Sequence, residues 1–413
     1  MRANGWGCTP PSANSKTGAR NVFSISRFHA LTKHLPRGVF DRAVEQCGAD
    51  KYSKGFSRWQ QLLVMLYAQL SGADSLRTVE AGFNAQAEHH YHLGAVEVRR
   101  STLSEANGRV SPEPFAALVR HLMAGIQRQA RRELTPLLQL LDSTAITLKG
   151  PGFDHWTFAE RSSRTQGIKL HVLYDNARQA PCWSAFSAAN VNDITAAQAL
   201  PLASGQCYVF DKGYCDYAWW HAIDQAGSRF VTRFKGNAAL RVVEQRPIEE
   251  ADRDTILADD VVVFRHRHNR AGHTNPYQAP LRRIVVARPD HARPLVLATN
   301  DLDSPATVIA GHYKARWNIE LFFKWIKQHL RLRRFLGRSE KAVRIQILTA
   351  LVAYLLVALA HRASASTTSL WLFLAELRAC LFQRPINEAH RHRRDKRRRD
   401  AGPSEPWQPG LFA

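Results

Sequence analysis

The segment 313–327, YKARWNIELFFKWIK, places polar groups at fixed intervals among large apolar side chains. Tyr313, Arg316, Glu320 and Lys327 follow the pattern Tyr-x2-Arg-x3-Glu-x6-Lys, and a helix would put all four on nearly one face. Because an unpaired carboxylate among apolar neighbours is costly, Glu320 needs a cation or a metal as its partner. An ion pair with Arg316 is the ordinary explanation and is compatible with a metal. The face as a whole suits a metal-bridged phosphate, although a solvated charged face would look similar.

Two aspartates upstream follow apolar runs. Asp142 stands in LLQLLDST and Asp211 in YVFDKGY, and we expect each to end a strand. Taken alone, the first could begin a hairpin turn and the second could cap a helix. Together with Glu320, however, they form a set of three carboxylates that can hold two divalent cations. Two such ions clamp the attacking and leaving oxygens of a phosphoryl transfer.

The chain from residue 137 to 235 predicts three strands followed by alternating helices and strands. A further β-rich stretch covers about 241–305, and a helix is expected over 303–330 with Asp303 or Ser304 as its N-cap. The expected strands are 137–142, 167–175, 182–190, 206–211 and 228–235, with helices at 193–203 and 216–227, and later strands at 259–268, 279–289 and 294–301.

These residues resemble the insertion-sequence-4 family of bacterial DDE transposases, over roughly 130–360. The resemblance implies an α/β fold: a ribonuclease H-like mixed sheet with a β-rich insertion, preceded by an all-helical N-terminal domain. It also implies that Asp142, Asp211 and Glu320 are the catalytic residues and bind two Mg2+ ions, with Mn2+ as a substitute. Tyr313, Arg316 and Lys327 would bind DNA phosphates.

One departure from the family concerns tryptophan. Some relatives use a tryptophan of the insertion to hold a flipped base, but none stands between Trp220 and Trp317 here. Phe264 or Tyr277 could stack on a base instead.

The N-terminal part predicts helices from residue 21 to 131. An apolar stripe runs along one helix, Thr102 and Glu105 could form a capping box, and Ser111 with Pro112 precedes another helix. A helical module of this kind suits DNA binding, and a packing or dimerisation domain is the alternative. The stripe consists of Trp59, Leu62, Leu63, Leu66 and Leu70.

Net charge and cysteine usage narrow the partner and the compartment. The formal charge is +22, which favours a protein that binds a polyanion such as nucleic acid. The alternative is a basic soluble protein, such as a ribosome-associated factor. The six cysteines form no CxxC pair, and the histidine pairs lack cysteine partners, so a zinc site is not supported. The apolar run 342–360 is long enough to cross a membrane, but Arg344 and Gln346 interrupt it, which favours a core helix.

The expected organisation is a disordered leader at 1–20, a helical DNA-binding domain at 21–131, a catalytic domain at 132–385 and a basic disordered tail at 386–413. The function expected is metal-dependent cleavage at insertion-sequence ends and strand transfer into target DNA. A nuclease without strand transfer and a non-catalytic DNA-binding regulator are the alternatives. Double-stranded DNA is the expected partner, bound by a homodimer in the bacterial cytoplasm at the nucleoid, with no membrane involved.

Overall fold

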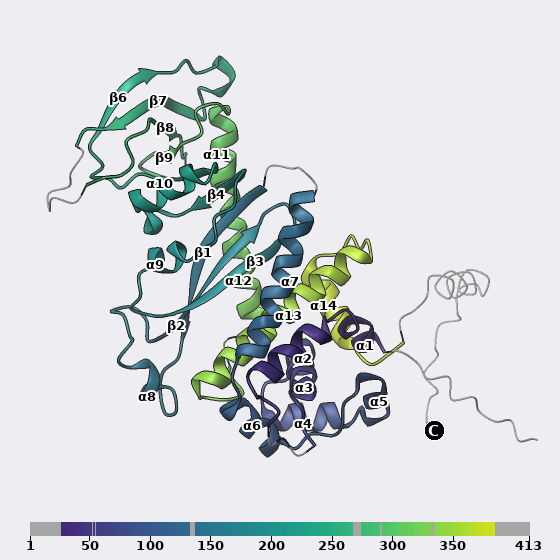
Figure 1. The fold of residues 1–413 in the computed structure, drawn as a ribbon. Helices are drawn as coiled ribbons and strands as arrows, with labels where there is room; N and C mark the ends of the chain where they lie inside the picture. The colour runs from purple at the N-terminus through teal and green to yellow at the C-terminus, as the bar shows by residue number, and fades with distance from the viewer. Residues whose placement is uncertain are drawn as a thin grey trace, which may run out of the picture.

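The computed structural model describes residues 26–384 except 52, 54, 133–136, 267–273, 290, 331 and 333. The leader and the basic tail expected from the sequence lie outside these residues. Within them, one mixed sheet is flanked by helices, and a group of helices packs below one end of it (Figure 1).

The sheet of the described part has nine strands in the order β3-β2-β1-β4-β5-β9-β8-β7-β6. β1 pairs in parallel with β4, and β4 with β5, whereas the other neighbours are antiparallel. The ribonuclease H-like mixed sheet predicted from the sequence is therefore confirmed. The strands are β1 Leu137–Thr147, β2 Gly167–Asp175, β3 Ala180–Ala188, β4 Gln206–Phe210, β5 Arg229–Arg233, β6 Leu240–Gln245, β7 Ile256–Phe264, β8 Leu281–Val286 and β9 Leu295–Thr299.

The insertion between β5 and the next helix continues the sheet instead of standing apart from it, because β9 pairs with β5. The sequence did not predict β6, an edge strand on which Leu240 is half-buried and Val243 is exposed. A buried ion pair joins Arg282 of β8 to Asp259 of β7, and Arg282 also donates to the backbone oxygen of Ser304. The insertion is thus tied to the start of the helix that follows it.

The helix expected over 303–330 is two helices, α11 Ala306–Ala315 and α12 Trp317–His329. The break has a local cause: the Arg316 N–H donates to the oxygen of Tyr313 and the Ile319 N–H to that of Arg316, a tighter i,i+3 pattern. Pro305 is the N-cap, one or two positions after the residues expected. The other helices between strands are short: α8 Asp154–Thr157, α9 Asp193–Gln198 and α10 Tyr217–Gln225. Single 3-10 turns lie at Lys212–Tyr214 and Glu250–Asp252.

The N-terminal part is helical, as expected. The apolar stripe lies on α3, which is buried almost all round. The capping box predicted at Thr102 and Glu105 is wrong, because α6 begins after Arg99 without a side-chain cap and Glu105 pairs with Arg109 instead. The helices are α1 Arg27–Thr32, α2 Arg37–Gln46, α3 Arg58–Ser71, α4 Leu76–Asn84, α5 His90–Leu93, α6 Arg100–Arg109 and α7 Glu113–Arg132, with a 3-10 turn at Ala87–His89.

The long helix α13, Glu340–Ala363, is the apolar run that could have crossed a membrane by length and composition. In its most apolar window 89% of the residues are buried inside the protein, which is the property of a core helix. It packs against α3, α6 and α7, and α14, Leu370–Ala379, packs beside it.

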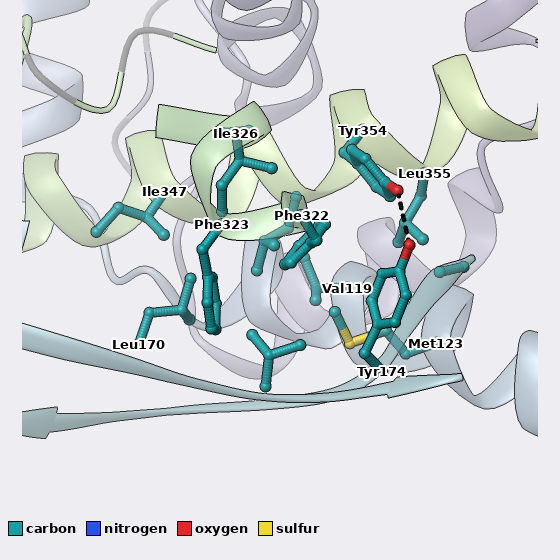
Figure 2. Packing of buried hydrophobic residues seen from close by; sticks show 14 of the residues in the cluster. Val119, Met123, Leu170, Tyr174, Phe322, Phe323, Ile326, Ile347, Tyr354 and Leu355 are labelled. Atoms are coloured by element: carbon teal, nitrogen blue, oxygen red, sulfur yellow. Dashed lines mark hydrogen bonds between the residues drawn. The ribbon is translucent and has the colours of Figure 1, made fainter. Parts of the chain in front are cut away.

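The same helix also contacts α12 and the sheet. Tyr354 of α13 packs edge-on against Phe322 of α12, with ring centroids 4.8 Å apart, and its hydroxyl lies 3.5 Å from that of Tyr174 in β2 (Figure 2). Helical module and sheet therefore share one continuous apolar core. The division at residue 131 stays a prediction.

Candidate active site

Three strands bring polar residues into one row at the edge of their parallel pairing. Leu141 of β1 pairs with Phe210 of β4, so the next residues, Asp142 and Asp211, come side by side. Val209 of β4 pairs with Val231 of β5, and the same register aligns Asp211 with Arg233 two residues later. The row across the sheet is therefore carboxylate, carboxylate, guanidinium.

The expectation that Asp142 ends its strand is wrong. β1 continues to Thr147, and Asp142 lies in its middle, opposite Val172 of β2. The reason is local: Ser-Thr-Ala-Ile-Thr after Asp142 is rich in β-branched residues and pairs with β2 as a hairpin. What ends at Asp142 is only the parallel pairing with β4. Asp211, in contrast, follows the last residue of β4, as predicted.

The helix pair α11 and α12 supplies the third carboxylate and a cation. Arg316, at the break between them, donates from Nη1 to Asp142 Oδ2 at 3.4 Å and pairs through Nη2 with Glu320 Oε1 at 2.6 Å. The ordinary ion pair expected between Arg316 and Glu320 is thus present. One guanidinium bridges a strand carboxylate and a helix carboxylate.

The electrostatics of Asp142 differ from those of a surface aspartate. Burial raises the pKa of its carboxyl to about 6, and the nearby carboxylates of Glu320 and Asp211 act in the same direction. The Ser143 N–H, which donates to Asp142 Oδ1 at 2.8 Å, and Arg316 oppose the rise without cancelling it. The site therefore disfavours negative charge on Asp142 until more positive charge is supplied.

Asp211 has the opposite balance. Burial by itself would raise its pKa, yet hydrogen bonds from Arg233 and from the Lys212 N–H outweigh burial, and the pKa lies below its ordinary value. Arg233 Nε donates to Asp211 Oδ1 at 3.0 Å, and the Tyr313 hydroxyl donates to the same oxygen at 3.2 Å. Burial also raises the pKa of Tyr313 to about 12, so the phenol keeps its proton as the donor.

Lys327, near the end of α12, contacts β1 beyond Asp142. Its Nζ donates to the Ala145 oxygen at 2.9 Å, three residues beyond Asp142 on β1. All four residues of the spaced helix pattern therefore point to the edge where Asp142 and Asp211 lie, or to the strand that leads from it. Lys324, which the sequence left without a role, is exposed on the same helix.

Sequence reasoning missed Arg233. Arg233 and Asp211 each stand two residues after a buried valine, but this match becomes visible only once β5 is known to pair with β4 in this register. The two aromatic residues of the insertion that were expected to stack on a base, Tyr277 and Phe264, differ in exposure. Tyr277 is 1% exposed beneath Phe230 and cannot reach a base, whereas half-buried Phe264 packs on Tyr217 at 4.4 Å.

The three carboxylates remain reachable. The exposed fractions of the side chains are 21% for Asp142, 34% for Asp211 and 32% for Glu320. Among the described residues, no three Asp, Glu, His or Cys side chains form a group that could hold a metal ion as they stand. Arg316 pairs with Asp142 and Glu320, and Arg233 pairs with Asp211. The donor set nevertheless fits hard divalent cations, which prefer carboxylate oxygens. Burial is the main cause of the raised pKa of Asp142, and a bound cation would favour its charged form.

Comparison with known proteins identifies the family of this chain. The family model of the transposase DDE domain matches residues 133–356, more than half of the chain. The chain belongs to the DDE transposase family. A second model, for a domain of unknown function, matches residues 24–96.

Named relatives support the resemblance to insertion-sequence transposases. The chain is 40% identical over 305 residues to a protein of Sinorhizobium fredii named as transposase y4zB, covering 71% of this chain and 83% of that protein. It is 26% identical over 259 residues to a protein of Geobacillus stearothermophilus named as the transposase for insertion sequence element IS5377, covering 62% and 66%. It is 28% identical over 152 residues to a Synechocystis protein named as the transposase for IS4SA, covering 37% and 40%.

One solved structure is titled as a piggyBac transposase synaptic complex with hairpin DNA. Its superposition covers 95% of this chain and 88% of the chain in that structure. The TM-score is 0.45 and the sequence identity 10%.

Proposed function

We propose that this transposase cuts DNA at the inverted-repeat ends of an insertion sequence and joins the freed 3′-OH to target DNA. The observation that carries the proposal is the row formed by Asp142 and Asp211 where the parallel pairing of β1 with β4 ends, with Glu320 joined to Asp142 through Arg316. Three reachable carboxylates of this kind suit metal-dependent phosphoryl transfer.

Asp142, Asp211 and Glu320 would hold two Mg2+ ions, for which Mn2+ can substitute. Bound there, the ions would polarise phosphate oxygens and make an attacking hydroxyl more acidic. The protein's own contribution is to fix the three carboxylates. The Ser143 N–H orients Asp142, Arg233 with Tyr313 orients Asp211, and Arg316 holds Glu320.

Arg316, Lys327 and Tyr313 would bind phosphates of the DNA. The guanidinium of Arg316 lies between Asp142 and Glu320. It would turn from these carboxylates toward a phosphate, which it would bind in bidentate geometry. Lys327 would act as a point charge beside β1, and the phenol of Tyr313 keeps a proton to donate.

The partner would be double-stranded DNA, bound by a homodimer in the end complex, in the bacterial cytoplasm at the nucleoid. The net charge of +22 supports a polyanionic partner. We assign the helical module at 21–131 to DNA binding, and tests of it should use the whole chain. Because α13 packs into that module, cutting the chain at residue 131 would expose apolar surface.

The test uses labelled duplexes that carry the element's ends, located as inverted repeats in the DNA flanking the gene. Asp142→Ala, Asp211→Ala and Glu320→Ala should each abolish Mg2+-dependent cleavage and joining while DNA binding in a gel shift survives. Cleavage without joining by the wild type would favour the nuclease alternative. Binding without cleavage would favour the regulator.

A further inference from the structure

The segment 148–166, which connects β1 to β2 and carries α8, forms an arm at the end of the hairpin away from the insertion (Figure 1). Hydrogen bonds inside the arm fix its shape. Asp154 Oδ1 accepts from the Gly150 N–H at 2.9 Å and from Gln166 Nε2 at 2.6 Å, and buried Thr157 donates to the Leu148 oxygen at 3.2 Å.

The arm is also anchored to the rest of the protein. Trp156 Nε1 donates to the Arg338 oxygen at 3.0 Å, and Arg338 Nη1 donates back to the Pro151 oxygen at 2.9 Å. These two bonds join the arm to the segment just before α13. The arm is therefore a built projection that can present side chains at fixed places.

Its exposed residues are an aromatic ring and cations. Phe158 is 56% exposed, and the Arg161 guanidinium lies 3.7 Å from the centre of its ring. Lys149 and Arg164 are exposed as well. Of the two acids in the arm, Asp154 is used by the internal hydrogen bonds, which leaves Glu160 against three cations. An exposed ring beside guanidinium groups suits nucleic acid, whose phosphates pair with the cations.

The arm continues a line of cations that starts at Arg316, beside Asp142. Arg316 lies at the level of Asp142 and Lys327 at the level of Ala145, and Lys149 follows the end of β1 at Thr147. At about 3.3 Å per strand residue, the end of β1 is about 17 Å from Asp142. Along B-DNA, at about 3.4 Å per step, this corresponds to about five base pairs.

We propose that this arm is a second DNA contact of the transposase, in which Lys149, Phe158 and Arg161 bind duplex DNA at least about five base pairs from the phosphodiester held by the three carboxylates. The proposal rests on the proposed function, because it takes Asp142, Asp211 and Glu320 to act on a DNA strand. Arg161 would pair with a backbone phosphate, and Phe158 would pack on the sugar or base beside it.

The experiment measures equilibrium binding of labelled end duplexes to the full chain at several salt concentrations. Arg161→Ala should lower the slope of log affinity against log salt by about one, as expected for a lost phosphate contact. Arg161→Lys should keep the wild-type slope. Phe158→Ala should weaken binding but leave the slope of log affinity against log salt unchanged. On one side of the cleavage site, shortening the duplex to fewer than about five base pairs should remove the DNA that the arm contacts, so that Arg161→Ala then binds like the wild type. The same shortening on the other side should leave the Arg161→Ala defect in place.

Arg362→Ala is the matched control, since Arg362 is exposed at the other end of α13. It should leave slope and length dependence unchanged. If Arg161→Ala shows the wild-type slope of log affinity against log salt, the arm's role is overturned and the proposed function is not. The same holds if Arg161→Ala binds more weakly than the wild type on both shortened duplexes, which is the result that a contact with a second protein copy would give. A wild-type chain that binds no end duplex would overturn the proposed function together with it.

Discussion

Replacing Asp142 by asparagine should stabilise the metal-free protein while destroying its activity. The pKa of Asp142 is about 6, against an ordinary value of 3.8, and burial is the main cause. The folded state therefore holds this proton more tightly than the unfolded state. The stability contributed by this group falls as pH rises from about 4 through about 6. Above pH 6 the folded protein bears the full free-energy cost of a charged, buried carboxylate.

The magnitude follows from the difference between the two pKa values. About two pH units at ~1.4 kcal/mol each give a cost of about 3 kcal/mol at pH 8 and about half of that at pH 5. Only 21% of the side chain is exposed, so solvent screening is limited. The asparagine amide carries no charge and avoids this cost. Asp142→Asn should therefore have a higher free energy of unfolding than the wild type, by up to about 3 kcal/mol at pH 8 and about half of that at pH 5.

The assay is urea unfolding of wild type and Asp142→Asn in EDTA at pH 5 and pH 8. Asp254→Asn, at an exposed position of the insertion, is the control and should change little. Added Mg2+ should then stabilise the wild type, because ligands that bind only the folded state do so, and should stabilise the variant less. Equal stability of Asp142→Asn and wild type at pH 8, or the same gain at both pH values, would refute the reasoning.

Three further outcomes are expected. Lys327→Ala should slow strand transfer by roughly tenfold or more, as the loss of a charged hydrogen bond implies, while Lys324→Ala on the same helix stays at the wild-type rate. Arg233→Ala removes the groups that hold down the pKa of Asp211, so the acid limb of the pH–rate profile should move to higher pH; an unmoved limb would contradict the assigned role. Leu351→Ala, at a fully buried position of α13, should lower the free energy of unfolding by about 2–5 kcal/mol in denaturant titration, whereas exposed Leu372→Ala should cost far less.

Much of the fold was predictable because local signals agree with it. The strand with Asp211 at its end is a short apolar run followed by a polar turn, and its place in the structure matches. The helix that carries Glu320 was predicted from 3.6-residue periodicity, but its break at Arg316 was not. No proline or glycine marks that break, and it consists only of a change in hydrogen-bond pattern.

The rest depended on pairing between strands, which a single sequence does not reveal. Asp142 lies in mid-strand because β2 pairs with the residues beyond it. Arg233 reaches Asp211 only because β5 is the parallel neighbour of β4 in one register. Similarly, α13 looks like any apolar helix until its neighbours from both halves of the chain are known.

The most direct test of the central claim is metal-specific rescue of the three carboxylates. Thiolate is a poor ligand for Mg2+ and a better one for softer ions such as Mn2+. Asp142→Cys, Asp211→Cys and Glu320→Cys should therefore be inactive in end cleavage with Mg2+ and regain part of the activity with Mn2+, at wild-type levels of DNA binding. Cleavage at the wild-type rate with Mg2+ by any of these variants would show that the replaced carboxylate does not hold the catalytic metal.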